Sequence, residues 1–361
     1  MAPLNTLDDR GETTVPEWAK RQQGGRTSNA VSLQTLVQNP TRMLCIGGGT
    51  GLPTVLKGLA PRAAPKPGDP GLDLTAVVAM SDDGGSSGRL RRARGLLPPG
   101  DIRNCLVAMA DGKSPLTEVF NYRFGGAKGL AGHAVGNLLI AALAELKGNF
   151  LEAVQSTGSM LGSRGTVLPC TLQSVELAAE LEDGSYVVGE RNIVRSGKRV
   201  KRVSLLPNRP PPVVGLLDAI READLITIGP GSLYSSIMPN LLVEGVAEAL
   251  RAARAMKVMV ANLMTQPGET DGLGCEDHVR AVLDHVGPVI DVVLLNSTPP
   301  AEAALTRYAQ RGSMPVVAQS RELLELGVIP ISADLLKSGP RVRHDSSKLA
   351  RRLIKLARTG L

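Results

Sequence analysis

Short apolar segments alternate along this chain with stretches in which apolar residues recur every three to four positions. The clearest of these segments lie at 43–46, 74–80, 225–228, 257–260 and 289–295. Apolar runs of this length, bounded by turn residues, are typical of strands buried on both faces, and helical stretches between them favour parallel pairing. The pattern therefore predicts an α/β fold, with a doubly wound and mostly parallel Rossmann-like sheet.

A different pattern occupies the middle of the chain, from about 170 to 212. Runs at 175–182 and 186–190 flank an Asp-Gly dipeptide, which favours a β-hairpin, and 199–205 would add another strand. We therefore predict a small antiparallel subdomain or flap that is inserted into the α/β domain.

The two ends of the chain differ from the central nucleotide-binding domain, which we place at 41–336. Residues 1–40 lack apolar periodicity, which predicts a flexible N-terminal extension. Residues 337–361 carry eight basic side chains against one acidic side chain. In this basic C-terminal segment, the apolar residues within 349–357 have the spacing of one helix face, so we expect a helix that docks on the domain.

Charge and hydropathy narrow the class of protein. The 361 residues carry a formal net charge of +7, and the C-terminal segment accounts for all of it, so the body of the protein offers little basic surface to nucleic acid. No apolar run approaches the roughly 20 residues of a membrane span, and the N-terminus lacks a signal-peptide pattern. We expect a cytoplasmic protein without membrane insertion.

The most informative segment reads Met-Leu-Cys-Ile-Gly-Gly-Gly-Thr-Gly-Leu-Pro, at 43–53. Its order of strand, glycine turn and amphipathic helix brings bare backbone and the positive end of a helix dipole together, which suits a phosphate. The candidate binding residues are Gly47, Gly48, Gly49, Thr50 and Gly51. Leu52 stands where a dinucleotide fingerprint requires its third glycine, and the segment lacks the Gly-Lys-Ser/Thr of a Walker loop. A merely tight strand-to-helix turn is the alternative.

A second glycine-rich loop follows the predicted strand at 74–80 and contains two adjacent aspartates. Asp82 and Asp83 lie where open parallel sheets bind ligands, and their carboxylates suit ribose hydroxyls or a divalent metal such as Mg²⁺. The same loop supplies further candidate ligand-binding residues at Ser86, Ser87 and Arg89. A solvated Asp-Gly turn is the alternative.

Other candidates follow a predicted strand or begin a predicted helix. Gly231 and Ser232 come directly after a strand and would hold phosphate or ribose, while Tyr234 would either stack on a base or pack in the core. Asn137 lies one helical turn after His133 and would face the same side.

Several strings of this sequence, taken together, resemble the bacterial gluconeogenesis factor family (YvcK, CofD-like). They lie at 47–51, 82–90, 98–104, 132–138, 229–234 and 265–270. The resemblance runs in order from about Met43 to the C-terminus. The other branch of the family, the 2-phospho-L-lactate transferase of coenzyme F420 synthesis, shares the fold and the glycine turn.

The resemblance implies a function. Members of the gluconeogenesis factor branch bind UDP-sugars, notably UDP-N-acetylglucosamine, and support growth and cell shape on gluconeogenic carbon sources through cell-wall synthesis, with no established reaction. The resemblance also implies that Tyr308 and Arg343 contribute to nucleotide-sugar binding. Tyr308 would stack on uracil and Arg343 would pair with diphosphate. The alternatives are a tyrosine that packs a helix and an arginine of the basic tail. Related proteins are phosphorylated by a Ser/Thr kinase just after a His-Asp pair. Ser346 stands there in this chain, and a helix cap is its alternative role.

Three hypotheses of different class follow. The first is a non-catalytic UDP-sugar sensor that acts on cell-wall synthesis proteins. The second is a transferase of the phospho-lactate type, which would act on a nucleotide-activated donor with Mg²⁺ at Asp82 or Asp83. The third is an NAD-binding protein, and the glycine pattern counts against it. All three are compatible with a homo-oligomer.

Overall fold

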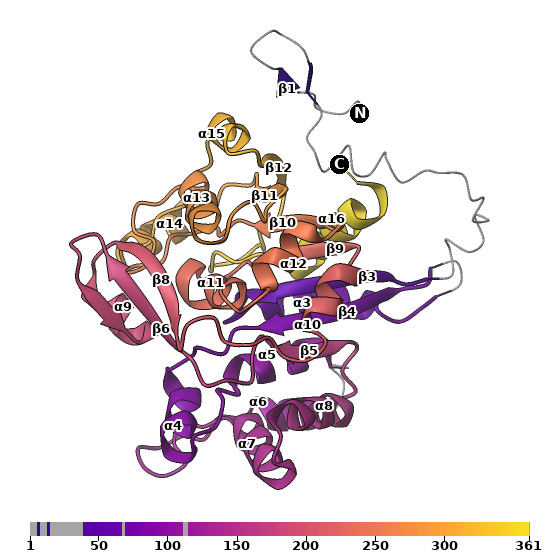
Figure 1. Cartoon of the computed structure of the whole chain (residues 1–361), viewed down its shortest axis with the longest axis vertical. Helices are drawn as coiled ribbons and strands as arrows, with labels where there is room; N and C mark the ends of the chain where they lie inside the picture. Colours follow the sequence, from indigo (N-terminus) through magenta and orange to yellow (C-terminus); the bar gives the residue numbers. More distant parts are fainter. Residues whose placement is uncertain (1–5, 8–12, 15–38, 67–68, 111–114, 361) are drawn as a thin grey trace.

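The structure is a computed structural model that describes residues 6–7, 13–14, 39–66, 69–110 and 115–360 (Figure 1). Near the N-terminus, β1 (Thr6–Leu7) pairs with β2 (Thr13–Thr14). The rest of the predicted flexible extension up to residue 38 lies outside the described residues, so its flexibility stays a prediction.

A seven-stranded sheet forms the centre of the molecule, with the strand order β12-β11-β10-β9-β3-β4-β5. Every neighbouring pair is parallel, which confirms the predicted fold class. The strands are β3 (Thr41–Gly47), β4 (Leu72–Val78), β5 (Thr166–Pro169), β9 (Leu225–Ile228), β10 (Met256–Val260), β11 (Val292–Asn296) and β12 (Ile329–Ala333).

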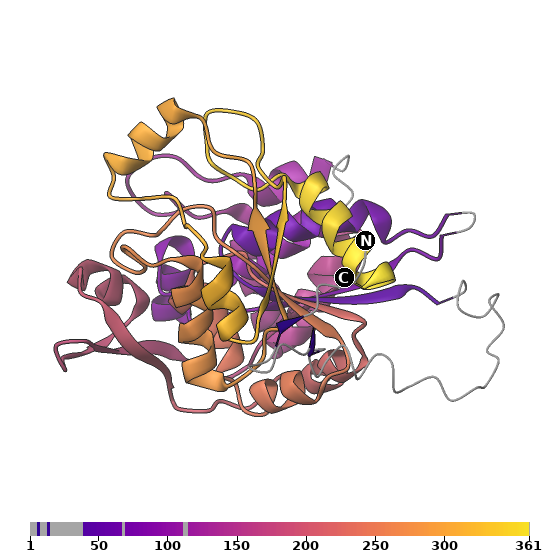
Figure 2. The same ribbon diagram turned by 90° about the horizontal axis from the view of Figure 1, so that it is seen from above.

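Helices cover both faces of this sheet, as Figure 2 shows. In chain order they are α3 (Gly51–Leu59), η1 (Ala60–Arg62), α4 (Gly85–Arg94), α5 (Gly100–Met109), α6 (Pro115–Asn121), α7 (Val135–Lys147), α8 (Phe150–Leu161), α10 (Leu216–Glu222), η2 (Leu233–Ile237), α11 (Met238–Leu241), α12 (Val246–Ala252), α13 (Cys275–Val286), α14 (Glu302–Ala309), α15 (Ser320–Glu325) and α16 (Ser346–Thr359). Within the described ranges, none of these helices combines the length and apolarity that a bilayer crossing requires.

The central strands are apolar because they are enclosed on both sides. Every residue of β9 and β10 is buried, which explains why the sequence shows continuous apolar runs there and no alternation. β3 pairs with β4 on one side and with β9 on the other. The chain therefore reverses its direction of travel across the sheet at β3, and the carboxyl ends of β3 and β9 flank the crevice where open α/β sheets bind ligands.

The predicted antiparallel flap is present as a three-stranded sheet with the order β7-β6-β8. Its elements are β6 (Glu176–Leu181), β7 (Tyr186–Val188), α9 (Glu190–Ser196) and β8 (Val200–Leu206). The hairpin turn forms because the Asp183 carboxylate accepts hydrogen bonds from Ser185 and because Gly184 has a φ of +80°. Figure 1 shows the flap beside the central sheet, with α9 on its outer side.

The C-terminal helix α16 packs against α3. Its apolar face is buried at Leu349, Leu353 and Leu356. A Cβ on Gly58 of α3 would lie only 2.0 Å from the carbonyl oxygen of Ser346, so the two backbones approach closely. The side chain of Asp345 accepts hydrogen bonds from two amides in the first turn of α16, at 2.9 Å each. Asp345 is therefore the N-cap, and the alternative role of Ser346 as a helix cap is wrong.

Candidate functional site

A cleft of about 740 Å³ opens at the carboxyl ends of β3, β9 and β10. Six segments that are distant in the sequence meet there: the glycine turn, the start of α9 in the flap, the loop before η2, the loop after β10, the end of α14 and the segment before α16. Their lining residues include Gly48, Gly49, Thr50, Gly51, Glu190, Gly231, Ser232, Asn262, Gln266, Tyr308, Arg311, Arg343 and His344. The cleft thus brings together many of the predicted binding residues.

The glycine turn approaches its neighbours too closely to admit side chains. A Cβ on Gly51 would lie 1.9 Å from the carbonyl oxygen of Pro230, and Gly49 has a φ of +60°. The amide of Gly49 already donates to the Asp101 carboxylate at 2.5 Å, whereas no described atom accepts from the amides of Thr50 or Gly51. Gly51 is therefore required by the packing of two loops, and the free donors lie at its end of the turn.

Gly47 is the one residue of the predicted turn that belongs to β3 and does not line the cleft. Its carbonyl oxygen accepts hydrogen bonds from the amide of Ala79 and from the side chain of Asn240, at 3.0 Å each. Gly47 therefore fixes the end of β3, from which the turn begins, and does not contact the cleft.

Glu269 occupies the position at the start of η2 where the sequence predicts a phosphate or ribose. Its Oε1 atom accepts hydrogen bonds from the Ser232 hydroxyl, from the Tyr234 amide at 2.9 Å and from the Ser235 amide at 3.0 Å. Burial raises the pKa of Glu269, and these three hydrogen bonds oppose that rise. Ser232 lines the cleft, but its hydroxyl and the neighbouring amides are already bound to a protein carboxylate.

The ring of Tyr234 is packed in the protein interior. The residue is 4% exposed, its hydroxyl donates to the Val200 carbonyl at 3.5 Å, and its ring lies near that of His285. Because the ring does not line the cleft, the packing alternative describes Tyr234 and stacking on a base does not. Gly231 lines the cleft and is held by Asn262, whose side chain bonds both its amide and its carbonyl.

A smaller cavity of about 120 Å³ adjoins the cleft and shares Gly49, Glu190, Ser235 and Ser236 with it. The carboxyl groups of Asp82, Asp101 and Glu190 line this cavity. Burial raises the pKa of Asp101 to about 6. Burial, together with the nearby carboxylates of Asp82, Glu269 and Asp83, raises the pKa of Glu190 to about 8. At neutral pH the cavity therefore holds carboxyl groups in different protonation states.

The predicted metal pair is divided between two places. Asp82 lines the small cavity and accepts a hydrogen bond from the Gly84 amide at 2.8 Å, whereas Asp83 lies against Gly189 at the start of α9. Among the described residues, no group of three or more His, Cys, Asp or Glu side chains is arranged to hold a metal ion. Mg²⁺ commonly takes one or two carboxylates together with ligand phosphates, and Asp82 and Asp101 are of that type.

The predicted ligand residues of the second glycine-rich loop and of α7 do not reach the cleft. The buried hydroxyl of Ser86 contacts His133 Nδ1 at 2.9 Å and accepts from Asn137 Nδ2 at 3.1 Å. Ser87 accepts from the Gly100 amide at 3.1 Å, at the start of α5. Arg89 donates to a backbone carbonyl at 2.8 Å. Ser86, Ser87, Arg89 and Asn137 therefore hold neighbouring segments of the protein in place.

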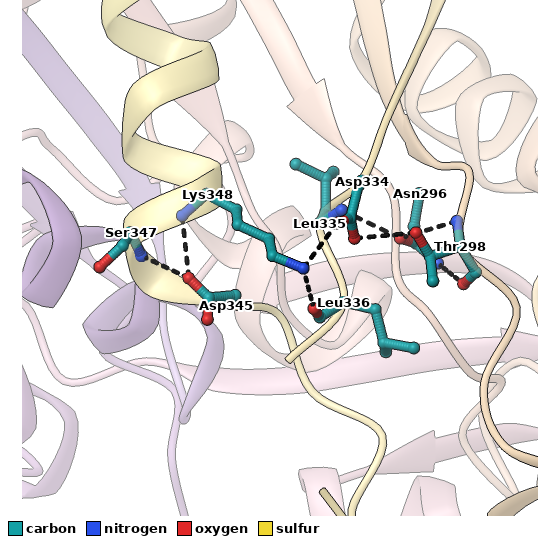
Figure 3. Close-up of polar contacts among 8 residues, drawn as sticks. All are labelled: Asn296, Thr298, Asp334, Leu335, Leu336, Asp345, Ser347 and Lys348. Carbon is teal, nitrogen blue, oxygen red and sulfur yellow. Dashed lines mark hydrogen bonds and ion pairs between the residues drawn. The ribbon is translucent and has the colours of Figure 1, made fainter. Parts of the chain in front are cut away.

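Tyr308 and Arg343, which the family resemblance implied, both line the cleft. Tyr308 is partly buried on α14, and the Arg343 side chain is exposed. The backbone carbonyl of Arg343 accepts from the Lys337 amide at 2.9 Å. Figure 3 shows that the first turn of α16, just after Arg343, is bonded to the residues that follow β12. There, Lys348 Nζ contacts an Asp334 oxygen at 2.6 Å and donates to the Leu336 carbonyl at 2.9 Å.

Some cleft residues were absent from the sequence-based candidates. Glu190 reaches the cleft from the flap, Arg311 follows α14, and His344 lies beside Arg343. A glycine with positive φ before Glu190 marks a sharp turn there, but nothing in the local sequence indicates that the turn faces the glycine turn of β3. Arg311 and His344 have no comparable signal.

Comparisons with known proteins agree over most of the chain. Residues 43–336 match the family model of 2-phospho-L-lactate transferase CofD. The chain is 43% identical to the gluconeogenesis factor of Bacillus subtilis, over 87% of this chain and 98% of the relative. It is 41% identical to the gluconeogenesis factor of Halalkalibacterium halodurans, over 86% and 95%. A crystal structure of a Bacillus halodurans member of the UPF0052 family has a TM-score of 0.83 and 41% identity, over 88% of this chain and 99% of that chain.

Proposed function

The chain belongs to the family of 2-phospho-L-lactate transferase CofD, and on that premise we propose that it is a non-catalytic receptor for a UDP-sugar. The ligand is of the UDP-N-acetylglucosamine type. Binding regulates cell-wall synthesis and cell shape during growth on gluconeogenic carbon sources. The name gluconeogenesis factor, borne by relatives of about 40% identity, supports a regulatory role over a transferase role.

The observation that carries this proposal is the meeting of Tyr308, Arg343 and the glycine turn in one cleft. The volume of about 740 Å³ lies within the range of roughly 300–1,000 Å³ that is usual for small-molecule sites. An aromatic ring suits a base, and a guanidinium together with the free amides of Thr50 and Gly51 suits a diphosphate. The lining thus offers partners for the base and for the diphosphate of a nucleotide sugar.

A transferase of the phospho-lactate type is the second candidate, and the small carboxyl-lined cavity favours it. Asp82 and Asp101 would hold Mg²⁺ there, next to the glycine turn and together with phosphate oxygens of the donor. A bound Mg²⁺ would neutralise charge on the phosphates of a nucleotide-activated donor. In that case Asp82 and Asp101 would position the cation, and the Gly49 amide would keep Asp101 oriented.

Calorimetric titration with UDP-N-acetylglucosamine, UDP-glucose, GDP and NAD, with and without Mg²⁺, tests these alternatives. We expect UDP-sugars to bind without Mg²⁺. Removal of charge-assisted hydrogen bonds in Arg343→Ala should weaken binding by about 1.5–3 kcal/mol, and Tyr308→Ala should also weaken it. Arg341→Ala and Tyr186→Ala are matched controls, because both residues are exposed and neither lines the cleft.

Each outcome decides between the hypotheses. Binding of GDP only in the presence of Mg²⁺ would favour the transferase, and preferential binding of NAD would favour an NAD-binding protein. A protein that binds no UDP-sugar under any of these conditions would refute the receptor. If Arg343→Ala and Arg341→Ala lost the same amount of UDP-sugar affinity, the ligand would have to bind outside this cleft.

A further inference from the structure

His344 is a buried polar residue with one unpaired ring nitrogen. It is 8% exposed and lines both the cleft and an adjoining second cavity of about 1010 Å³. One ring nitrogen forms a hydrogen bond with the backbone of Ala261, which follows β10. The other, Nε2, has no partner among the described residues. Leaving a buried polar atom without a partner is costly, so we expect the partner of Nε2 in a ligand.

The hydrogen bond with Ala261 determines whether Nε2 acts as a donor or as an acceptor. Because a backbone carbonyl accepts only, the ring must donate to it through Nδ1, and Nε2 is then left with its lone pair. Burial lowers the pKa of His344 to about 4, so the ring is neutral at pH 7. A neutral acceptor gains nothing from a phosphate oxygen, which also accepts. It requires an N–H or O–H group.

Gln266 gives a second, independent indication of the same chemistry. Its side-chain oxygen is buried, has no partner among the described residues, and belongs to a residue that lines the same cleft. The loop that carries Gln266 is fixed, because Thr265 exchanges hydrogen bonds with Ser313 and Met314 at 2.6–2.9 Å. The lining of the cleft therefore includes two residues that each carry a buried, unpaired acceptor, as well as the cationic residues Arg311 and Arg343.

We propose that His344 is a specificity residue of the cleft, whose Nε2 accepts a hydrogen bond from an N–H or O–H group of the bound nucleotide sugar. This inference rests on the proposed UDP-sugar function. The donor is either the imide N–H of a pyrimidine base or a hydroxyl or amide N–H of the sugar. In both cases His344 and Gln266 recognise the uncharged part of the ligand, while Arg343 and the glycine turn bind its phosphates.

The test is titration of His344→Phe, which keeps a ring of similar size and removes Nε2. We expect UDP-N-acetylglucosamine to bind about tenfold more weakly, as the loss of one hydrogen bond predicts. His344→Gln should retain most of the affinity, because its amide oxygen can accept near the position of Nε2. His278→Phe is the matched control: His278 is 2% exposed, bonds the Gly274 carbonyl and has an unpaired Nε2, but does not line the cleft.

Two further ligands identify the donor. If His344 binds the base imide, the wild type should bind 3-methyl-UDP about tenfold more weakly than UDP, and His344→Phe should bind the two equally. If it binds the sugar, the preference for UDP-N-acetylglucosamine over UDP should fall about tenfold in His344→Phe while UDP affinity stays unchanged.

Unchanged affinities for all these ligands in folded His344→Phe would overturn the role of His344 and leave the UDP-sugar receptor standing. A loss of the same size in His278→Phe would also overturn it. Failure of the wild type to bind any UDP ligand would instead refute the proposed function. If His344→Phe does not fold, the wild type alone can still decide. The proposal would be overturned if the wild type bound UDP, 3-methyl-UDP and UDP-N-acetylglucosamine with equal affinity.

Discussion

Replacing Glu190 by glutamine should stabilise the protein at alkaline pH and leave its stability near pH 5 almost unchanged. Glu190 begins α9 of the flap and points into the small cavity beside the cleft. Burial there, with the carboxylates of Asp82, Glu269 and Asp83 nearby, raises its pKa to about 8, and a hydrogen bond with Ser235 opposes that rise. The carboxylate form is thus disfavoured in the folded protein.

The sign of the effect follows from proton linkage. In the unfolded chain Glu190 has an ordinary pKa near 4.5, so between about pH 4.5 and pH 8 the folded state retains a proton that the unfolded state releases. The free energy of unfolding therefore falls as the pH rises through this window, and levels off above pH 8. One pKa unit corresponds to about 1.36 kcal/mol. Because Glu190 is only partly buried, solvent weakens the effect, and we expect the free energy of unfolding to fall by about 1–3 kcal/mol across this window.

Thermal unfolding from pH 5 to pH 9 measures this difference. Glu190→Gln should unfold at about the wild-type temperature at pH 5 and about 2–6 °C higher at pH 9. Glu182→Gln is the control. It removes the same charge from the flap, but at an exposed position in the hairpin. The reasoning would be refuted if the unfolding temperatures of Glu190→Gln and wild type differed by the same amount at every pH. It would also be refuted if Glu182→Gln showed the same pH-dependent difference.

The remaining predictions concern the glycine turn and the C-terminal segment. Gly49→Val should abolish UDP-sugar binding in a folded protein, because a β-branched residue is strained at a φ of +60°, and unchanged affinity by calorimetry would contradict the phosphate assignment. Gly51→Ala should reduce thermal stability more than Gly49→Val, because its Cβ meets the Pro230 backbone at 1.9 Å; an equal or smaller loss would contradict the packing role. Ser346 lines the second cavity with Arg343, so Ser346→Glu should draw Arg343 from the ligand and weaken UDP-sugar binding. Unchanged affinity and unchanged complementation of growth on a gluconeogenic carbon source would contradict a kinase switch at this residue.

The sequence was sufficient to predict the centre of the fold but not its edges. β9 and β10 are buried on both faces, so their apolar runs are unbroken and easily recognised. The two strands at the edges of the sheet, β5 and β12, each contain a proline, at Pro169 and Pro330. Proline cannot donate to a neighbouring strand and is tolerated at edges, which also makes such strands difficult to distinguish from loops.

The site could be predicted only where sequence order determines position. The glycine turn and the loop at Gly231 each follow a parallel strand, so both had to lie at the same edge of the sheet. The carboxyl groups that reach this edge from elsewhere could not be predicted. Asp101 comes from the start of α5 and Glu190 from the flap, and only tertiary packing places them together. Glu269 follows β10 and so was expected at this edge, but its hydrogen bonds with the start of η2 could not be predicted.

Those carboxyl groups change how the glycine turn can bind an anion. Asp101 already holds the Gly49 amide, and Glu269 holds the amides at the start of η2, so two positions that would otherwise attract a phosphate are filled by the protein itself. A diphosphate in the cleft would meet only the Thr50 end of the turn, with carboxyl groups nearby. Binding then depends on positive charge from outside the sheet, which Arg311 and Arg343 provide. The segment before α16 is therefore an integral part of the candidate site.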